Sequence, residues 1–380
     1  MIGVNKPNLK SIPPSRKNEK WRYSDLDLLE MPTKETFDYT SDIEYHTQNN
    51  MFYYIVFIDG MYNKKKSKFP EDSVKVYYQS NSSLCDFGNL YSKHQVIQNI
   101  QNTDKIVCID VNKSLDKPLQ LIKMIVSSCN MFTIKIILNK NCKIKLFEKF
   151  IQQTQHNFYL NNITKIDLGS HSKCTHFFEK DIKYKGKSIY TLEVNSEDNS
   201  SYKNYFVNSQ YSSHRFESDI YLKAENAIAN FYGVCIATDN QIFDVVIDIH
   251  HHASNTSSKQ HYHQVLNKNS IGSFYSNVFI AQFLNQVEAH QLNKNLIIDH
   301  KSQAYSRPML NINSDDVICS HGATTGNISQ DILSYFASRG IQYFQAKRLI
   351  IIGLLKSVFS KCELEDYEIK FLYSQINNAI

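Results

Sequence analysis

The chain has 380 residues, 42% hydrophobic and 21% charged, which is the usage of a folded globular protein and excludes a disordered chain. Its 42 basic and 37 acidic residues give a formal charge of +5, too small and too evenly spread to indicate a nucleic-acid partner. No apolar run approaches the roughly 18 residues that span a bilayer, and the N-terminus lacks a signal-peptide apolar segment. We therefore expect a cytoplasmic protein with no membrane partner.

The first region, residues 1–130, is predicted to combine an N-terminal arm with a small α/β domain. Residues 1–20 are polar and contain three prolines, which prevent a long helix and indicate an arm. Trp21, the single tryptophan, follows directly and is expected to anchor this arm on a core surface rather than to stack on a ligand.

Three local patterns follow in the same region. Residues 51–60, MFYYIVFIDG, are rich in aromatic and β-branched side chains and end in Asp-Gly, which predicts a buried strand closed by a turn. The lysines at 64–66 are expected in a solvated loop. The apolar spacing of residues 91–101 predicts a short helix.

The second region, residues 131–322, is a series of short segments with two-residue periodicity joined by turns rich in Asn, Asp, Ser and Lys. The crossover helices of a doubly wound sheet are missing from it. A sandwich, a barrel and a parallel β-helix remain, and the even spacing favours the β-helix without deciding the matter.

The third region, residues 323–380, is predicted to be a helical domain. Ser329 is suited to cap a first helix that ends at Gly340. Apolar spacing predicts a second helix over residues 342–360 and a third over 365–377. Such a tail would cap a solenoid and leave any unused apolar face to a partner.

Two groups of residues carry the metal-ligand chemistry of the chain. The first is a histidine group that could bring imidazoles of adjacent strands together on a metal, formed by His250, His251, His252, His261 and His263. Because residues 253–260 contain no carboxylate at a ligand interval, polar packing along a strand face is the preferred interpretation of this group.

The second group is the run Cys319, Ser320 and His321. Neighbours on a strand point to opposite faces, so these residues do not form a catalytic triad, but Cys319 and His321 share one face. A thiolate and an imidazole suit iron or an iron-sulfur fragment, although two ligands are half a site and a partner would supply the rest.

The cysteines give no further site. All eight are scattered without a C-x-x-C pair, which argues against a disulfide framework and against a self-sufficient zinc or iron-sulfur centre; they lie at positions 85, 108, 129, 142, 174, 235, 319 and 362. Most are expected to be small buried hydrophobic residues.

Residues 306–341, SRPMLNINSDDVICSHGATTGNISQDILSYFASRGI, resemble the C-terminal signature of the SufB/SufD family of iron-sulfur cluster assembly proteins, and the SHGAT form is that of its SufD-like members. Residues 18–26, 57–62 and 287–299 also resemble family segments at matching places. The resemblance covers nearly the whole chain.

The resemblance implies a mainly β fold, with a right-handed parallel β-helix flanked by an N-terminal domain and a C-terminal helical domain. It implies a heterodimer with a SufB-like subunit and binding of a SufC-like ATPase through the C-terminal helices, within residues 342–360. By the same likeness His321 falls on an interface histidine involved with the nascent cluster, and Cys319 on the thiol beside it. Iron or a cluster would be held transiently with the SufB-like partner, with no permanently bound cofactor.

The expected function is therefore that of a non-catalytic scaffold subunit. Three alternatives stay open at this point. His321 could only pack the interface, and the isolated chain could form a homodimer. The alternative from another class is a β-helix enzyme with a histidine-rich metal site within residues 250–263, acting on a carbohydrate.

Overall fold

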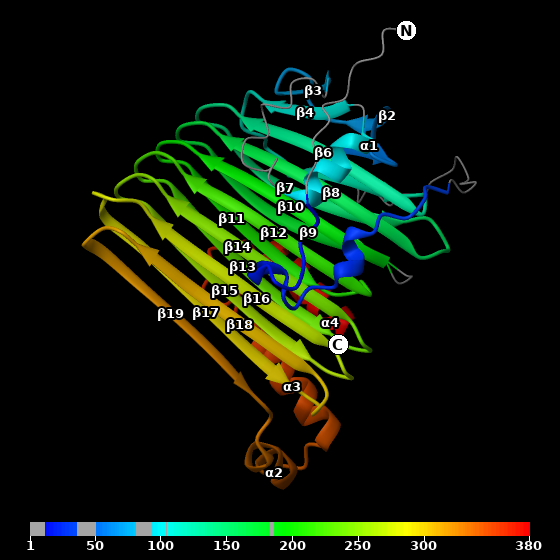
Figure 1. The fold of residues 1–380 in the computed structure, drawn as a ribbon, viewed down its shortest axis with the longest axis vertical. Helices are drawn as coiled ribbons and strands as arrows, with labels where there is room; N and C mark the ends of the chain where they lie inside the picture. Colours follow the sequence, from blue (N-terminus) through cyan, green and yellow to red (C-terminus); the bar gives the residue numbers. More distant parts are fainter. Residues whose placement is uncertain (1–11, 36–50, 81–92, 104, 183–185) are drawn as a thin grey trace.

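The computed structural model describes residues 12–35, 51–80, 93–103, 105–182 and 186–380, and they form a β-solenoid flanked by short helices (Figure 1). Successive strands alternate between two sheets, so that each turn of the chain adds one strand to each sheet. The mainly β fold expected from the sequence is confirmed, and the stacked parallel coils exclude the sandwich and the barrel.

The two sheets run the length of the molecule. In order of pairing, the ten-stranded sheet contains β19 (Asp316–Gly326), β17 (Asn285–Ile297), β15 (Ser257–Leu266), β13 (Ile228–Ala237), β11 (Ser201–Asn208), β9 (Lys173–Asp181), β7 (Lys143–Gln152), β5 (Leu119–Ile125), β1 (Tyr53–Ile58) and β2 (Met61–Lys68). The nine-stranded sheet contains β18 (Gln303–Ile312), β16 (Ile271–Ile280), β14 (Ile242–His251), β12 (Ser213–Leu222), β10 (Gly186–Ser196), β8 (Phe158–Leu168), β6 (Cys129–Leu138), β4 (Lys105–Val111) and β3 (Val74–Ser80).

Each coil buries every second side chain in the interior of the solenoid. In β14 these are Phe243, Val245 and Ile247, all fully buried, and they pack with their counterparts from neighbouring coils in one continuous apolar cluster. The pairing is parallel and in register, as in Ser213 opposite Ile242. The period-2 patterns of the sequence thus have one inner and one outer face on every strand.

Asparagine takes the place of glycine at many of the turns. Asn141, Asn199, Asn226 and Asn255 all have positive φ angles, between 52° and 64°, in turns that lead from a strand of the nine-stranded sheet to the next strand, in the ten-stranded sheet. Asn tolerates this left-handed conformation better than most residues with a side chain, because its short polar group bonds locally. The chain can therefore make its turns with a total of 11 glycines.

The interior also contains a polar cluster. Lys123 on β5 and Glu148 on β7 form an ion pair there, and His176 on β9 lies beside Glu148 at 3.3 Å. The Tyr190 hydroxyl donates to Glu148 at 2.7 Å. Burial raises the pKa of Glu148, but Lys123 and His176 outweigh it and bring that pKa down to about 2, so the buried carboxylate is ionised.

The two ends of the solenoid differ. At the N-terminal end β2 is antiparallel to β1, after a turn in which Asp59 and Gly60 have positive φ, and β3 is antiparallel to β4. The predicted strand of residues 51–60 is confirmed. The lysines at 64–66 lie in strand β2, not in the expected loop, although Lys64 and Lys65 are exposed. At the other end β18 and β19 are each paired on one side only.

The boundaries at residues 130 and 322 stay predictions. Parallel pairing of β4 with β6 and of β5 with β7 continues both sheets N-terminal to residue 131. β19 in turn extends to Gly326 before the chain becomes helical.

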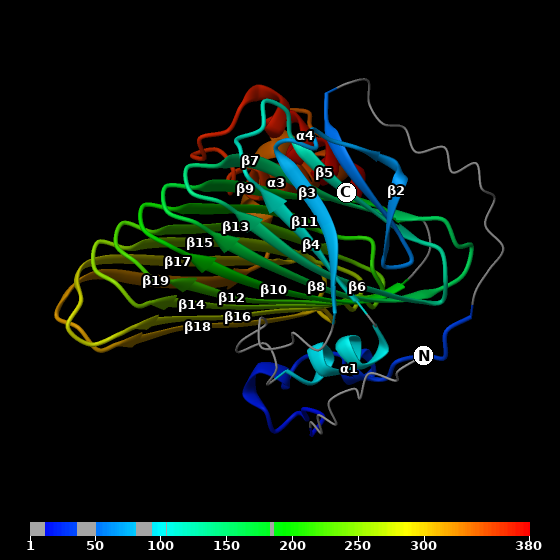
Figure 2. The ribbon, with the colours of Figure 1, turned by 90° about the horizontal axis from the view of Figure 1, so that it is seen from above.

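The C-terminal helices are α2 (Gln330–Ser338), α3 (Tyr343–Lys356) and α4 (Asp366–Ala379). Ser329 caps α2 by accepting a bond from the Asp331 amide, and Gly340 follows with φ of 77°, as the sequence predicts. The end of α3 and one face of α4 cover the outer face of the ten-stranded sheet, where Leu355 and Leu372 are fully buried (Figure 2). No helix among the described residues is long and apolar enough to cross a membrane.

The opposite side of the solenoid carries α1 (His94–Asn102) and the N-terminal segment, residues 12–35, on the outer face of the nine-stranded sheet (Figure 2). This segment contains two 3-10 turns, Glu19–Trp21 and Leu26–Leu29. Trp21 is 7% exposed and lies over the Arg215 guanidinium, 3.8 Å from ring centroid to Cζ. The prediction that Trp21 anchors the arm is confirmed.

Candidate functional site

Cys319 and His321 lie in β19, the last strand of the ten-stranded sheet. In the parallel pairing with β17, Cys319 is opposite Ala289 and His321 is opposite Gln291. Ala289 and Gln291 are both buried, so the two candidate ligands belong to the strand face that looks into the solenoid. Ser320 between them is on the outer face, where its hydroxyl lies 2.7 Å from Nδ1 of His290. The sequence-based placement of Cys319 and His321 on one face is therefore correct.

Cys319 is half-buried against a small apolar cluster that includes Val278, Val287 and Ala289. Burial raises the pKa of the Cys319 thiol, which a hydrogen bond from the Ala289 backbone lowers in part. The thiol therefore holds its proton at neutral pH, and binding a metal there would release that proton.

His321 is exposed, in contrast to Gln291 opposite it. The Gln291 side-chain amide lies inside the coil, where its Nε2 donates to the Ser276 hydroxyl at 2.7 Å. One coil further on, no described residue covers His321 in the same way, because β19 has no neighbour on its outer edge. The imidazole is thus presented at the open end of the solenoid.

The open end has the features of an interface. β18 and β19 each leave one row of backbone N–H and C=O groups without a strand partner, which is a template for pairing with another chain. Apolar side chains lie beside these edges, among them Ile312 at 39% and Ile318 at 64% exposed. The inner positions Leu310 and Val317 are only partly covered by the preceding coil.

A second apolar surface lies on α2 and the first half of α3, which contact each other and extend beyond the sheets (Figure 1). Phe344 on this surface is 72% exposed. The large exposed side chains of the surface are Ile332, Tyr335, Tyr343, Phe344 and Leu349. We call these five residues the helical patch. Exposed apolar groups at this density are typical of a docking surface.

The histidine group does not converge. His250 is on β14 of the nine-stranded sheet, while His261 and His263 are on β15 of the ten-stranded sheet. His251 points into the interior and is bonded to Thr256 and Ser258, and His263 contacts the Leu354 carbonyl at 3.1 Å. The hypothesis of four imidazoles around one metal is therefore wrong, because consecutive strands of a coil belong to different sheets.

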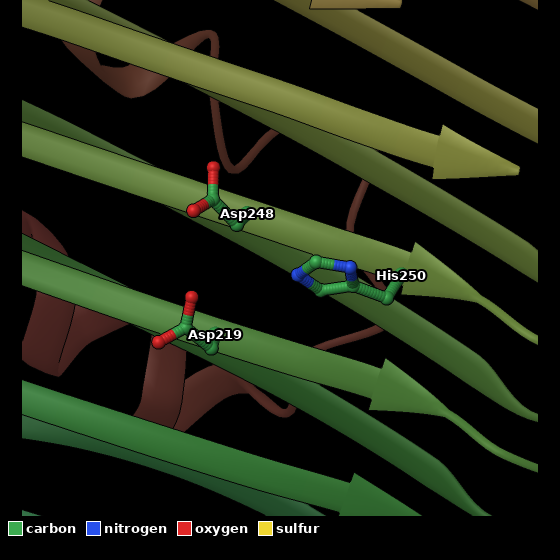
Figure 3. Close-up of side chains that lie close together, drawn as sticks. All are labelled: Asp219, Asp248 and His250. Carbon is green, nitrogen blue, oxygen red and sulfur yellow. The ribbon is translucent and has the colours of Figure 1, made fainter. Parts of the chain in front are cut away.

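His250 instead joins two carboxylates that the sequence analysis missed. One ligand atom from each of Asp219, Asp248 and His250 lies within 4.8 Å of the others (Figure 3). Asp248 is two residues before His250 on β14, and Asp219 on β12 is directly opposite Asp248. The sequence prediction considered carboxylates only in residues 253–260, which follow the histidines, whereas both aspartates precede His250. An alignment of consecutive coils would have placed both aspartates beside His250.

Residues 126–354 match the family described as SUF system FeS cluster assembly, SufBD core domain. The match includes β19 with Cys319 and His321. The chain belongs to the SufBD family.

Two of the similar proteins match most of this SufBD chain, and a third matches about a third of it. The iron-sulfur cluster assembly SufBD family protein slr0076 of Synechocystis is 23% identical over 92% of the chain and 84% of its own length. Protein ABCI7, chloroplastic, of Arabidopsis thaliana is also 23% identical, over 92% of the chain and 79% of its own length. The iron-sulfur cluster assembly protein SufD of Escherichia coli is 27% identical over 36% of the chain and 32% of its own length.

In this SufBD protein the three candidate surfaces are well separated. The open end with Cys319 and His321 closes the solenoid, the helical patch extends from the ten-stranded side, and the Asp219–His250 group faces outward from the nine-stranded sheet (Figures 1 and 3). Five of the seven cysteines among the described residues are buried, as expected for small hydrophobic residues.

Proposed function

We propose that this SufBD protein is a SufD-like scaffold subunit that pairs with a SufB-like subunit through the open end of its solenoid. The observation that carries the proposal is the position of the SHGAT signature, which is on β19, an edge strand that is paired on one side only. The free edges of β18 and β19 and the exposed Ile318 favour a partner that continues both sheets.

Cys319 and His321 would take part in cluster assembly at that interface. They offer one thiol and one imidazole on the same strand face, and a four-coordinate iron needs further ligands from the partner. Because the pKa of the Cys319 thiol is raised, the thiol keeps its proton until a metal ion displaces it. Iron or the nascent cluster is thus a transient cargo here, shared between two subunits.

The helical patch is the proposed docking surface for a SufC-like ATPase. Most of α4 and the end of α3 are used to cover the ten-stranded sheet. The exposed aromatic residues of α2 and α3, led by Phe344, face away from that sheet cover and are available to a partner. ATP hydrolysis would belong to this partner, and the chain itself would serve as a non-catalytic scaffold.

The location of such a complex stays a prediction. The sequence led us to expect the cytoplasm, and one of the similar proteins is named as chloroplastic.

The first experiment is co-expression of the tagged chain with the SufB-like and SufC-like proteins of the same organism, followed by mass measurement of the purified complex. We expect the three proteins to elute together. Phe344→Asp should lose the ATPase and keep the SufB-like subunit, because the patch and the open end are separate surfaces. Elution of the chain alone would refute the scaffold proposal.

The second experiment measures cluster formation in the reconstituted complex. His321→Ala should reduce the amount of cluster without preventing assembly of the subunits, and Cys319→Ala should do the same. His300→Ala is the matched control, since His300 is also an exposed histidine but lies in the turn between β17 and β18. Equal cluster yields for His321→Ala and His300→Ala would reduce His321 to a packing residue.

A further inference from the structure

The outer face of the nine-stranded sheet carries a compact acidic cluster outside the proposed assembly site. Asp219 and Asp248 are directly opposite each other on β12 and β14, so their carboxylates project from the same face one strand apart. Both are buried, at 6% and 3% exposed, and are contacted by Lys93, which directly precedes α1, and by Lys20 of the N-terminal segment. His250 follows two residues after Asp248 and completes a group whose ligand atoms lie within 4.8 Å (Figure 3).

His250 is held rigidly in this group. Its ring is stacked between Tyr221, 4.6 Å away, and Phe279, 4.7 Å away, on the two flanking strands. An imidazole held in one orientation by its neighbours is pre-organised to ligate a metal ion.

The positive and negative charges around Asp219, Asp248 and His250 do not cancel. Counting the described residues in the network, four carboxylates face three cations; the acids are Glu217, Asp219, Asp244 and Asp248, and the bases are Lys20, Lys93 and Arg215. Lys93 bridges Glu217 at 2.6 Å and Asp219 at 2.5 Å, and Arg215 pairs with Glu217 and Asp244. Lys20 pairs with Asp248. The cluster therefore keeps one negative charge in excess.

One carboxylate oxygen of this cluster has no partner among the described residues. The Asp248 side chain is 5% exposed, and its Oδ2 atom pairs with Lys20. Its Oδ1 atom is buried and accepts no hydrogen bond from the part of the chain that the structure describes. A buried carboxylate oxygen without a partner is costly, and a coordinated cation is one of the few groups that satisfies it.

We propose that Asp219, Asp248 and His250 form a binding site for a divalent first-row transition-metal ion, and that Lys20 of the N-terminal segment is the cation that competes for it. Two carboxylate oxygens and one imidazole nitrogen suit Fe²⁺, Co²⁺, Mn²⁺ or Zn²⁺, with water completing the coordination. The site is built on rigid strands.

Lys20 can leave the group because its side chain is 36% exposed and it enters from a separate segment of the chain. The neighbouring contacts of that segment, Trp21 on Arg215 and Tyr23 stacked on Tyr305, do not depend on Lys20. A bound metal would therefore replace one positive charge by two, and the Lys20 ammonium would turn to solvent. Lys93 stays paired with Glu217 and with Oδ2 of Asp219.

The test is titration of the full chain with Co²⁺, followed by the visible ligand-field bands of the ion. Removing the competing charge should strengthen binding, so Lys20→Met should lower the Kd for Co²⁺ about tenfold or more. In the Lys20→Met background, Asp248→Asn and His250→Gln should each abolish the bands. Thiolate-to-cobalt charge-transfer bands in the near ultraviolet identify any Co²⁺ bound at cysteines instead.

His252→Ala is the matched control, because His252 is exposed and stacks 6.0 Å from His250 without belonging to the ligand group. It should bind Co²⁺ as the parent does. Circular dichroism verifies that each variant is folded, and the gain expected for Lys20→Met does not depend on a damaged variant. Equal Kd values for the parent and Lys20→Met, or bands that survive His250→Gln, would overturn the proposal. The test does not involve SufB-like or SufC-like partners, so its outcome is separate from that of the proposed function.

Discussion

Lys123 Nζ lies 2.5 Å from Glu148 Oε2 in the interior of the solenoid, and neither side chain is exposed to solvent. The pair is further satisfied by Asn162, whose side-chain oxygen lies 2.6 Å from Lys123 Nζ, and by the Tyr190 hydroxyl. Because an interior charge is tolerated only while it is paired, these residues should depend strongly on one another.

Removal of the lysine should therefore unfold the protein more easily. We expect Lys123→Met to lower the free energy of unfolding by about 3–5 kcal/mol, since it removes the lysine that pairs with the buried Glu148 carboxylate. Lys149→Met is the control: its ion pair with Glu179, at 2.8 Å, is partly exposed, so its loss should cost about 1 kcal/mol or less. Urea denaturation followed by circular dichroism measures both. Similar losses for the two variants would contradict this account.

The lowered pKa of Lys180 should make the stability of the protein depend on pH. Burial lowers the pKa of this interior lysine from 10.5 to about 7, an effect that Cys235 opposes in part, and its other neighbours are Tyr211, Asn208 and His214. Between pH 7 and about 10.5 the unfolded chain holds a proton that the folded chain lacks, so this group makes stability rise with pH in that window.

Lys180→Met should flatten this rise and raise the free energy of unfolding at pH 7 by about 1 kcal/mol or more. Lys223→Met, at an exposed position directly after β12, should change neither the rise of stability with pH nor the free energy of unfolding at pH 7. Thermal denaturation at several pH values between 6 and 10 distinguishes the two variants. A stability profile for Lys180→Met that keeps the parent slope would show that the lysine stays charged in the fold.

Two glycines should respond oppositely to alanine. A Cβ at Gly233 in β13 would lie 2.8 Å from Phe206 and 3.0 Å from Tyr262, so Gly233→Ala should destabilise the protein by about 1–3 kcal/mol. At Gly353 in α3 a Cβ meets nothing within 4 Å, and Gly353→Ala should stabilise by about 0.5–1 kcal/mol through helix propensity. Chemical denaturation of both variants checks the signs. Destabilisation by both would mean that α3 packs more tightly than described.

Trp21 should hold the N-terminal segment on the sheet. Replacing it with alanine removes the contact with Arg215 and exposes apolar surface, so the segment should detach and trypsin should cleave after Arg16, Lys20 or Arg22 faster than in the parent. Ile12→Ala is the control, since Ile12 is 92% exposed. Peptide mass spectrometry during limited proteolysis gives the rates. Unchanged cleavage in Trp21→Ala would assign the anchoring to the ion pairs of Glu19 with Arg307 and of Lys20 with Asp248.

Much of the architecture was predictable from local pattern. The alternation in β14 and its neighbours, the cap at Ser329 and the C-terminal Gly340 all express rules that operate within a few residues. The lysine run in β2 was not predictable in this way, because its place in a sheet is decided by the hairpin with β1 and not by its own weak strand preference.

The candidate sites were also predictable in part from local pattern. That Cys319 and His321 share a face follows from period 2 alone, whereas their place at an unpaired edge depends on which strand is last in the stack. The partners of His250 were missed because Asp219 is a full coil away in sequence and adjacent only through register. Buried cations such as Lys123 were also invisible, since nothing in the sequence marks which strand positions face inward against a glutamate.

The unlike ends of the solenoid set a limit on how copies of this chain can assemble. A strand added to β18 or β19 would find a parallel, weakly charged edge, whereas the other end presents the antiparallel strand β2 with Lys64, Lys65 and Lys68 exposed. The head of one molecule therefore does not match the tail of the next. A fold made of repeating coils, which could otherwise grow into a fibre, has in these unlike ends a barrier to head-to-tail stacking.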